Sequence, residues 1–544
     1  MKLPRYSMSV PPTGVALVIM AGLYLLLGLV GHDPWKSDDV SGIGIAWSMI
    51  QGSGWLVPRI AGEPFLAHPP LYFWIAAVTG KGLSWAIAPH DAIRLASGLF
   101  GALFFAGMGV TAGSLYGSQT RSAAVLSALG CIGLLVHIHD ANPAIALLAF
   151  LPWAVHGLNL ARERPGKGGA IAGWAIGLAF LAAGWVAPMI LVPLALTLPL
   201  ISTHWRNRAA YTGIALALIL GAAIATAWPA LLFWLRPAMA AVWWQQSVQA
   251  IDFGAPQWPR IAGFMELLPW YAWPALPLAL WALWLERRSL RQPGVVLPLT
   301  LLATTLFALS ATADPRSGTA LPLLPPFVLL AARAAGSLQR GAANAFDWFG
   351  MMTFSFFAGV VWLGWIAMLS GEPAPLARVF AKMEPGFALH FSAFAFVIAC
   401  SLTLAWTWLV FSTPRSPQRG TLHWAAGVIL TWGLVTTLWL PWIDYGKSYR
   451  RLSDSLAAAL PAERGRICAR NMGDAQRASF HYFDDIVTVR QVRRDASQCK
   501  LLLVSSSGSD TQEFSAGAAW HKIWEGRRPG DRNELFRLYR RDRS

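Results

Sequence analysis

Two acidic segments lie beside long apolar stretches of the chain. Asp38 and Asp39 stand at the start of SDDVSGIGIAWSMI, and Asp140 lies within HIHDANPAIALL, between two apolar runs. An ionisable group at such a place is a functional-site hypothesis, because its desolvation is costly. A carboxylate there can act as a general base on a hydroxyl group. Asp140 could equally cap the helix that follows it, since Asp is a favoured N-cap residue.

Three histidines could join Asp140 in a metal cluster, because imidazole and carboxylate groups are both zinc ligands. They are His68, His137 and His139. An H-x-H pair before an aspartate is weak spacing evidence, and histidines at a membrane edge more often form structural hydrogen bonds. The residues alone leave both interpretations open.

The composition is that of a membrane protein. Of the 544 residues, 55% are hydrophobic and only 13% are charged, whereas soluble domains carry about 25% charged residues. A soluble globular chain and a disordered chain are both excluded. The net charge of +16 favours membrane lipids over nucleic acid as partners, because apolar sequence dominates the chain.

The acidic and histidine side chains must be positioned by the long apolar runs around them. A helix that spans a membrane needs about 20 apolar residues. We predict thirteen spans, at 14–31, 92–115, 122–138, 141–160, 170–183, 186–202, 209–230, 267–285, 295–312, 319–337, 349–370, 388–411 and 422–443. The 170–202 region could also be one broken hairpin. Residues 71–88 are interrupted by Lys81 and Pro89, and we expect them to form a helix that lies at the membrane interface.

Positive charge predicts the orientation of these spans. With the N-terminus in the cytoplasm, every cytoplasmic connection is short and basic, which is the positive-inside pattern. An odd number of spans then places the C-terminal part outside, in the periplasm of a bacterium whose inner membrane holds the protein. Most acidic residues of 1–444 face that outer side, which indicates either chemistry on this face or plain solubility of the outer loops.

The first outer loop, 32–91, has the length of a functional loop. Ile43, Ala46, Trp47 and Ile50 follow the two acids at helical spacing, which predicts an amphipathic helix lying on the membrane. A second lateral helix is expected after Pro69 and Pro70. The loop therefore carries Asp38 and Asp39 to the outer edge of the spans.

The chain divides near Asp444 into a membrane part, 1–444, and a soluble part, 445–544. The alternating residue pattern of the soluble part predicts a small α/β domain, with strands near 466–470, 486–492, 500–508, 521–526 and 534–541. We expect it either to recognise the acceptor or to form a structural lid. Cys468 and Cys499 each border a predicted strand, so they can form a disulfide if those strands are neighbours. Cys131 and Cys400 lie inside spans and should stay reduced.

Four stretches resemble the GT-C fold glycosyltransferases that use a polyprenyl-phosphate sugar donor, above all the bacterial aminoarabinose–lipid A transferases and the protein-mannosyltransferase-like group. They are SDDVSGIGIAWSMIQGSGWLVPRIAGEPFLAHPPLYFW, HDANPAIALL, GLAFLAAGWVAPMILVPLAL and LFALSATADPRSGTALPLLPPFVLLAARA. Together they are distributed over residues 30–335. The resemblance implies an α-helical polytopic membrane protein with a GT-C-like membrane domain, about 13 transmembrane helices and a small C-terminal α/β periplasmic domain.

The resemblance also implies roles for residues. Asp38 matches the family's catalytic carboxylate, Asp39 its second acid, and Asp140 a further important acid. The leaving lipid phosphate needs basic partners, and the candidates are Arg59, His68, Lys81, Arg94 and Arg316. Arg94 could instead be a snorkelling anchor at the end of a span.

Departures from the family pattern concern the lysines and the metal ligands. The family's E-K-P-P segment is Ala67, His68, Pro69 and Pro70 here, and the lysine of its K-G segment is Ala183. The relatives' Glu and His, the pair proposed to bind a metal, are replaced by Ala67 and Gln246. The resemblance therefore predicts no metal and no cofactor at this position.

The resemblance implies a membrane glycosyltransferase. It would move a sugar from an isoprenoid (undecaprenyl-type) phosphate carrier to a lipid, glycan or protein acceptor on the outer face of the inner membrane. The missing lysines and Glu keep a second class open, a flippase or transporter-like protein or a non-catalytic lipid-binding homologue. Transporters usually show repeats in matching halves, and none is visible in this sequence.

Overall fold

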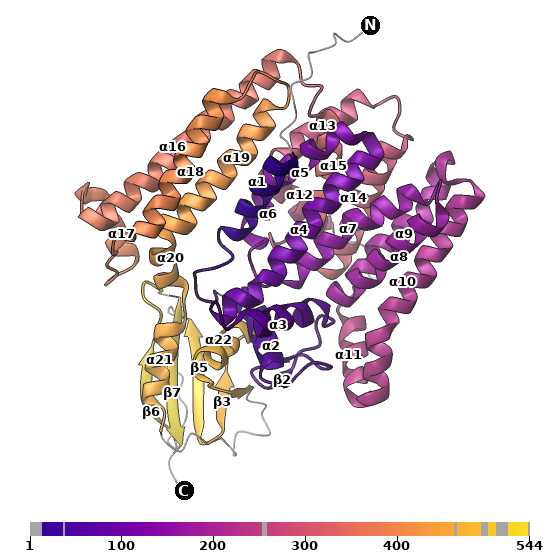
Figure 1. Cartoon of the computed structure of the whole chain (residues 1–544). Helices are drawn as coiled ribbons and strands as arrows, with labels where there is room; N and C mark the ends of the chain where they lie inside the picture. The colour runs from indigo at the N-terminus through magenta and orange to yellow at the C-terminus, as the bar shows by residue number, and fades with distance from the viewer. Residues whose placement is uncertain are drawn as a thin grey trace.

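The computed structural model describes residues 14–35, 38–252, 258–461, 465–490, 499–507, 520–531 and 533–541. Figure 1 shows a large helical bundle with a smaller α/β domain at one end, beside the helices α2 and α3. The predicted fold class is confirmed: a polytopic helical protein with a small C-terminal sheet domain.

Eight helical stretches among the described residues are long and apolar enough to cross a membrane. They are α4 (Pro89–Tyr116), α7 (Pro143–Leu160), α8 (Pro165–Ala183), α10 (Arg208–Leu235), α14 (Pro293–Thr312), α16 (Arg340–Ser370), α18 (Ala393–Ser412), and α19 (Arg419–Leu434) joined through the π-helical turn Val435–Trp439 to α20 (Leu440–Lys447). Four of them begin with proline at the first helical position, where its missing N–H costs nothing.

The other five predicted spans are shorter or broken. Four coincide with apolar helices too short for that criterion: α1 (Gly14–Leu26), α9 (Val186–Ile201), α13 (Ala275–Leu285), and α15 (Leu324–Ala334) with the 3₁₀ turn before it. The predicted span 122–138 divides into α5 (Arg121–Leu129) and α6 (Ile132–His137). The predicted span 267–285 starts inside α12 (Trp258–Tyr271), and Pro274 separates that helix from α13. Residues 170–202 form two helices rather than one broken hairpin.

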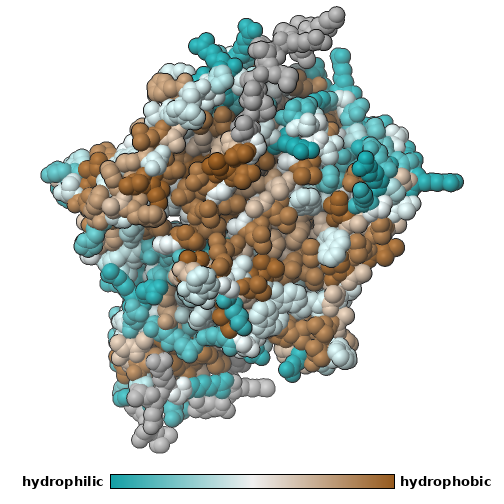
Figure 2. All heavy atoms as spheres, viewed as in Figure 1, coloured by the Kyte–Doolittle hydropathy of each residue, from teal (hydrophilic) through white to brown (hydrophobic). Residues whose placement is uncertain are grey.

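The outer surface of the bundle is apolar. Figure 2 shows hydrophobic residues covering the middle of the bundle, with hydrophilic residues at its far end and over much of the α/β domain. Large exposed side chains on the spans include Phe233 and Trp234 of α10 and Phe411 of α18. A soluble protein would not leave so much apolar surface in water, so the chain is a multi-span membrane protein.

The first loop folds into α2 (Asp38–Ile50), a short hairpin of β1 (Arg59–Ile60) and β2 (Glu63–Pro64), and α3 (Leu71–Leu83). Both lateral helices form, and the apolar face of α2, which was expected to meet the membrane, packs against protein. It packs between α3 and α22 (Asp474–Asp484) of the C-terminal domain. A Cβ atom added to Gly44 would lie 2.8 Å from the Cβ of Ala478. Trp47, counted on the membrane face, packs edge-on against Tyr482 of α22.

The C-terminal domain is a five-stranded sheet in the order β4-β3-β5-β7-β6, with α21 (Arg450–Ala459) and α22. Its strands are β3 (Ile467–Arg470), β4 (Thr488–Arg490), β5 (Leu501–Ser507), β6 (Trp520–Gly526) and β7 (Glu534–Arg541). Each predicted strand is present, although residues 491–492 and 508 of two of them lie outside the described residues. β3 is parallel to β4 and β5, while β7 is antiparallel to β5 and β6. Two helices, α11 (Pro237–Gln249) and α17 (Ala374–Met383), connect spans.

A disulfide joins Cys468 of β3 to Cys499, just before β5, with Cα atoms 5.9 Å apart. The two strands are neighbours, as this pairing requires. Cys131 is buried and reduced, and Cys400 is a free thiol in α18.

Replacing both Cys468 and Cys499 by serine should lower the stability of the C-terminal domain. A cross-link between residues 31 positions apart restricts the unfolded chain and contributes up to about 3–4 kcal/mol. Thermal unfolding of the purified protein, with and without reductant, measures this effect. Reductant should lower the transition of the parent protein and leave that of the double variant unchanged. Equal transitions for both proteins would contradict the expectation.

Candidate active site

Asp38 stands at the first position of α2 with its side chain exposed. Its Oδ2 accepts a hydrogen bond of 3.2 Å from Nδ2 of Asn142. Asn142 is also the N-cap of α7, where its Oδ1 accepts from the N–H of Ala144. The capping role that the sequence allowed for Asp140 thus belongs to Asn142. Asp38 is therefore oriented by the loop between α6 and α7 while its carboxylate stays open to solvent.

Asp140 lies in that same loop, and its side chain is 27% exposed. Its Oδ2 is 3.4 Å from Nδ1 of His137. Burial raises the pKa of Asp140 to about 6, the negative charges of Asp39 and Asp38 add to the rise, and His137 opposes it. Such a carboxyl can exchange a proton close to neutral pH.

Asp39 was predicted to be catalytic, and both of its carboxylate oxygens are bonded within the protein. Arg94 donates to both of its oxygens, from Nε at 3.0 Å and from Nη2 at 2.8 Å. The backbone N–H groups of Trp35 and Ala141 donate to the same carboxylate. Burial alone would raise the pKa of Asp39, but Arg94 outweighs it and holds that pKa below its usual value. Asp39 has no free lone pair directed at a substrate, and it ties α2 to the α6–α7 loop.

Arg94 was predicted to bind the lipid phosphate, and its guanidinium group is bonded within the protein instead. Its side chain is fully buried, and all five of its N–H groups are used. Besides Asp39, it donates to Oδ1 of Asp91 and to the backbone carbonyls of His32 and Asp33. A guanidinium group saturated in this way has no donor left for a phosphate. Because the head group is buried, Arg94 does not snorkel to the membrane surface.

Two of the predicted phosphate-binding residues remain near Asp38. The buried Nδ1 atom of His68 has no hydrogen-bond partner, and the charge of Asp38 acts on its ring. Burial is the larger effect and lowers the pKa of His68. Arg316 lies two residues from Gly318, which borders Asp38 and His137. Its side chain is 77% exposed, with only a loose contact of 3.7 Å to Asp314.

Arg59 and Lys81 do not join these residues. Arg59 lies in the β1–β2 hairpin, where its Nη1 donates to the carbonyl of Gly62 at 2.8 Å. Lys81 is exposed in the last turn of α3. It lies about 15 Å along the helix from Leu71, the first residue of α3 and the end nearer to His68 in the chain, at 1.5 Å per residue. Asn142 was missed by sequence reasoning, although its place directly before Pro143 is a helix-start signal.

Comparisons with known proteins agree with this architecture. The profile of the family described as dolichyl-phosphate-mannose-protein mannosyltransferase matches residues 67–228. Two proteins of Pseudomonas aeruginosa, strains LESB58 and PAO1, are named undecaprenyl phosphate-alpha-4-amino-4-deoxy-L-arabinose arabinosyl transferase. They are 26% and 27% identical to this chain over 456 residues, which are 78% of this chain and 74% of each of them.

The solved structure of ArnT from Cupriavidus metallidurans, bound to undecaprenyl phosphate, superposes on this chain with a TM-score of 0.69. The match covers 96% of this chain and 97% of that chain, at 16% sequence identity. This chain shares the GT-C fold of ArnT. The predicted resemblance to aminoarabinose transferases and mannosyltransferase-like proteins is confirmed.

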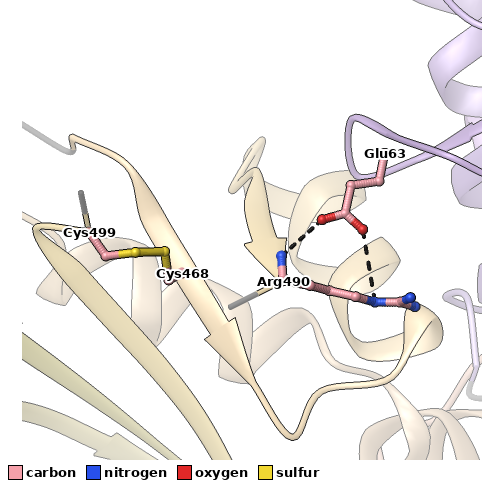
Figure 3. Close-up of a disulfide and its surroundings, with 4 residues drawn as sticks. All are labelled: Glu63, Cys468, Arg490 and Cys499. Atoms are coloured by element: carbon pink, nitrogen blue, oxygen red, sulfur yellow. Dashed lines mark hydrogen bonds and ion pairs between the residues drawn. A yellow bond between two sulfur atoms is a disulfide. The ribbon is translucent and has the colours of Figure 1, made fainter. Parts of the chain in front are cut away.

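The metal position that the resemblance implies for ArnT relatives is built differently in this chain. Ala67 and Gln246 line one small pocket of about 180 Å³, so the two replaced positions do meet in space. The carboxylate of Glu63 in this pocket accepts from Arg477 and from the backbone N–H of Arg490. Figure 3 shows Glu63 reaching across to Arg490 at the end of β4, with the Cys468–Cys499 disulfide on the adjacent strands. An alanine and an amide beside an ion-paired carboxylate do not fit a zinc ion, which is bound by Cys, His, Asp or Glu side chains.

The histidine cluster that the sequence allowed is not assembled either. Both ring nitrogens of His139 face backbone carbonyls, those of Leu135 and Tyr24. Within the described ranges, no group of three or more His, Cys, Asp or Glu side chains could hold a metal ion.

Activity of this protein should survive treatment with EDTA, because Ala67 and Gln246 supply neither the carboxylate nor the imidazole of the relatives' proposed metal site. Transfer assays with chelator-treated protein, with and without added Zn²⁺ or Mg²⁺, measure this. A loss of turnover that a divalent ion restores would contradict the expectation and show that other side chains bind the ion.

Proposed function

We propose that this chain is a membrane glycosyltransferase that moves a sugar from an isoprenoid-phosphate carrier to an acceptor, with Asp38 as the general base. The observation that carries the proposal is the contrast between two adjacent acids. Asp39 is buried and saturated, whereas Asp38 is exposed, oriented by Asn142 and close to the open Arg316 segment. The relatives named as arabinosyl transferases and the fold shared with ArnT support this reaction class.

In the reaction, an acceptor oxygen attacks C1 of the sugar while Asp38 accepts or orients its proton. The bond between C1 and the phosphate oxygen breaks, and the isoprenoid phosphate leaves with the electron pair. Arg316 and His68 are the described candidates for the phosphate, because both have unused donor capacity near Asp38. Asp140 and His137 lie beside Asp38 and can hold the released proton.

Purified protein tests the proposal directly. Incubation with an undecaprenyl-phosphate-linked aminoarabinose donor and a lipid A acceptor should release undecaprenyl phosphate and yield a glycosylated product, both read by mass spectrometry. If donor is consumed only by slow hydrolysis with every lipid, glycan or protein acceptor tried, the transferase proposal fails. Comparing the envelope glycolipids and glycans of a deletion strain with those of its parent then identifies the sugar and the acceptor.

We propose that the protein lies in a bacterial inner membrane with its N-terminus in the cytoplasm and its C-terminal domain in the periplasm. The short basic connections Arg162–Lys167, Arg206–Arg208 and Arg287–Arg291 support this orientation through the positive-inside rule. The disulfide of the C-terminal domain suits an oxidising compartment. Asp38 and the acids near it then act on the periplasmic side.

Reporter fusions test the orientation. A reporter that is active only in the periplasm should be active after Ser544 and silent after Arg288, because the two positions are expected on opposite sides of the membrane. The reverse pattern would place Asp38 in the cytoplasm, and the proposed site would face the wrong compartment.

We further propose that the chain divides near Asp444 and that its C-terminal domain positions the first loop. Asp33 of that loop accepts hydrogen bonds from Ser448 and Arg450. His90, at the start of α4, bonds to the hydroxyl of Tyr482 at 2.8 Å. These contacts support the structural-lid role expected from the sequence, since they fasten the domain to the loop that carries Asp38.

A further inference from the structure

A polar pocket of about 590 Å³ lies at the end of the bundle opposite to Asp38. Its lining includes Ser114, Asn159, Arg162, His204, Glu286 and Arg333. Helix α4 connects the two ends: it begins beside the C-terminal domain at His90 and ends at Tyr116 in this pocket. Its 28 residues span about 42 Å at 1.5 Å per residue. The pocket is therefore separate from the candidate active site.

Two hydrogen bonds and a contact with an aromatic ring orient the side chain of Arg162 in this pocket. Its Nε donates to the carbonyl of Asn159 at 3.0 Å and its Nη2 to Oδ1 of the same residue at 2.7 Å. Its guanidinium group lies 5.1 Å from the ring centre of Trp205, a fully buried side chain fixed by a hydrogen bond to the carbonyl of Leu158. An arginine that stacks on an aromatic ring keeps its planar set of N–H donors in a fixed orientation. This is the arrangement by which arginine recognises carboxylate and phosphate groups.

Arg162 has no counter-ion among the described residues, since its neighbour Glu163 acts on it only at a distance. The carboxylate of the pocket, Glu286, is already paired. Its Oε1 accepts from Nη2 of Arg333 at 2.8 Å and its Oε2 from the hydroxyl of Ser289. The charges of Glu286 and Arg333 cancel, so the positive charge of Arg162 remains unmatched in the pocket.

The pocket also has the size and surroundings for more than a single small ion. Ligand sites commonly measure about 300–1,000 Å³, and this one contains hydroxyl, amide and imidazole groups beside the arginine. It lies beside basic connections of the bundle, and basic segments next to spans attract anionic lipid headgroups. The hydroxyls of Ser114 and Ser289 and the amide of Asn159 already donate within the protein. The guanidinium of Arg162 is therefore the group that a phosphate would bind.

We propose that this pocket binds a phosphate-bearing ligand, with Arg162 as its anchoring cation. The ligand is either the headgroup of an anionic phospholipid or a free phosphate compound, and the two share the chemistry that Arg162 recognises. This site is independent of the proposed transferase reaction, so it can be present even if that proposal fails.

Native mass spectrometry of the full-length protein tests the proposal, with phosphatidylglycerol, phosphatidylcholine or inorganic phosphate as the added probe. The protein should retain phosphatidylglycerol or phosphate in preference to phosphatidylcholine. Arg162→Gln should weaken that binding roughly tenfold, because a charge-assisted hydrogen bond is lost. Arg164→Gln, which removes an exposed arginine that does not line the pocket, should leave binding unchanged.

A second variant covers the case in which Arg162→Gln does not fold. Gln292→Glu places a carboxylate in the pocket at the N-terminus of α14, where the helix dipole tolerates it, and it should also weaken binding roughly tenfold by charge repulsion. Retention of phosphatidylglycerol alone identifies a lipid site, and retention of phosphate alone identifies a soluble ligand. Equal binding of all probes, or equal losses in Arg162→Gln and Arg164→Gln, would overturn the proposal.

Discussion

Asp38→Asn should reduce sugar transfer by about a hundredfold or more while leaving the protein folded, because it removes a general base and keeps the shape of the side chain. The amide oxygen of the new side chain can still accept the hydrogen bond from Asn142. Since Asp38 is exposed and carries no buried ion pair, stability should change little. Single-turnover assays with a defined isoprenoid-phosphate donor measure the chemical step.

Asp454→Asn is the matched control, because Asp454 is an exposed aspartate on α21 of the C-terminal domain. It should retain the turnover of the parent protein. If Asp38→Asn transfers sugar at a near-normal rate, Asp38 is not the base and the carry-over from the family motif is wrong. If both variants lose activity together, the loss reflects the fold of the outer region rather than the chemistry.

Arg94→Gln should destabilise the protein by about 3–5 kcal/mol, because it leaves the buried carboxylate of Asp39 without its cation. The side chains of Arg94 and Asp39 are 0% and 5% exposed, so water cannot replace the lost partner. Arg94→Lys should recover only part of the loss, since lysine cannot reproduce a planar fork of five donors. Thermal unfolding and the yield of monodisperse protein measure both variants.

Arg316→Gln is the matched comparison for a predicted phosphate-binding arginine that remains exposed. Its removal should change stability by less than about 1 kcal/mol, because exposed ion pairs contribute little, and should raise the KM for the donor. The opposite pattern, a stable Arg94→Gln with weakened donor binding, would restore the phosphate-binding role that the sequence motif suggests for Arg94.

The sequence was sufficient for the elements that depend on local pattern. Apolar runs located the spans, and alternating residues located the five strands of the C-terminal domain. The breaks were harder to predict. The predicted span 122–138 is mostly apolar, yet it divides near Gly130, whose carbonyl accepts a hydrogen bond from Trp424. Such a contact between distant segments leaves no local signal.

The different roles of Asp38 and Asp39 in the candidate site also could not be predicted from local sequence. Asp38 and Asp39 are adjacent and chemically alike, and family motifs describe them as a pair. Successive residues of a helix point about 100° apart, so α2 turns one carboxylate outward and the other into the protein. Whether the inward one would meet a cation depended on Arg94, 55 positions away, and only the folded chain brings them together.

The burial of α2 between α3 and α22 restricts how chimeric enzymes can be assembled from this protein and its relatives. A methyl group added at Gly44 would lie 2.8 Å from the Cβ of Ala478, so α2 and α22 would have to move apart. Grafting a foreign C-terminal domain at residue 444 would therefore misplace Asp38, even if every membrane span stayed native. A functional hybrid has to exchange residues 32–91 together with residues 445–544. We therefore expect these two segments to change together in evolution, although the spans of the bundle separate them in the chain.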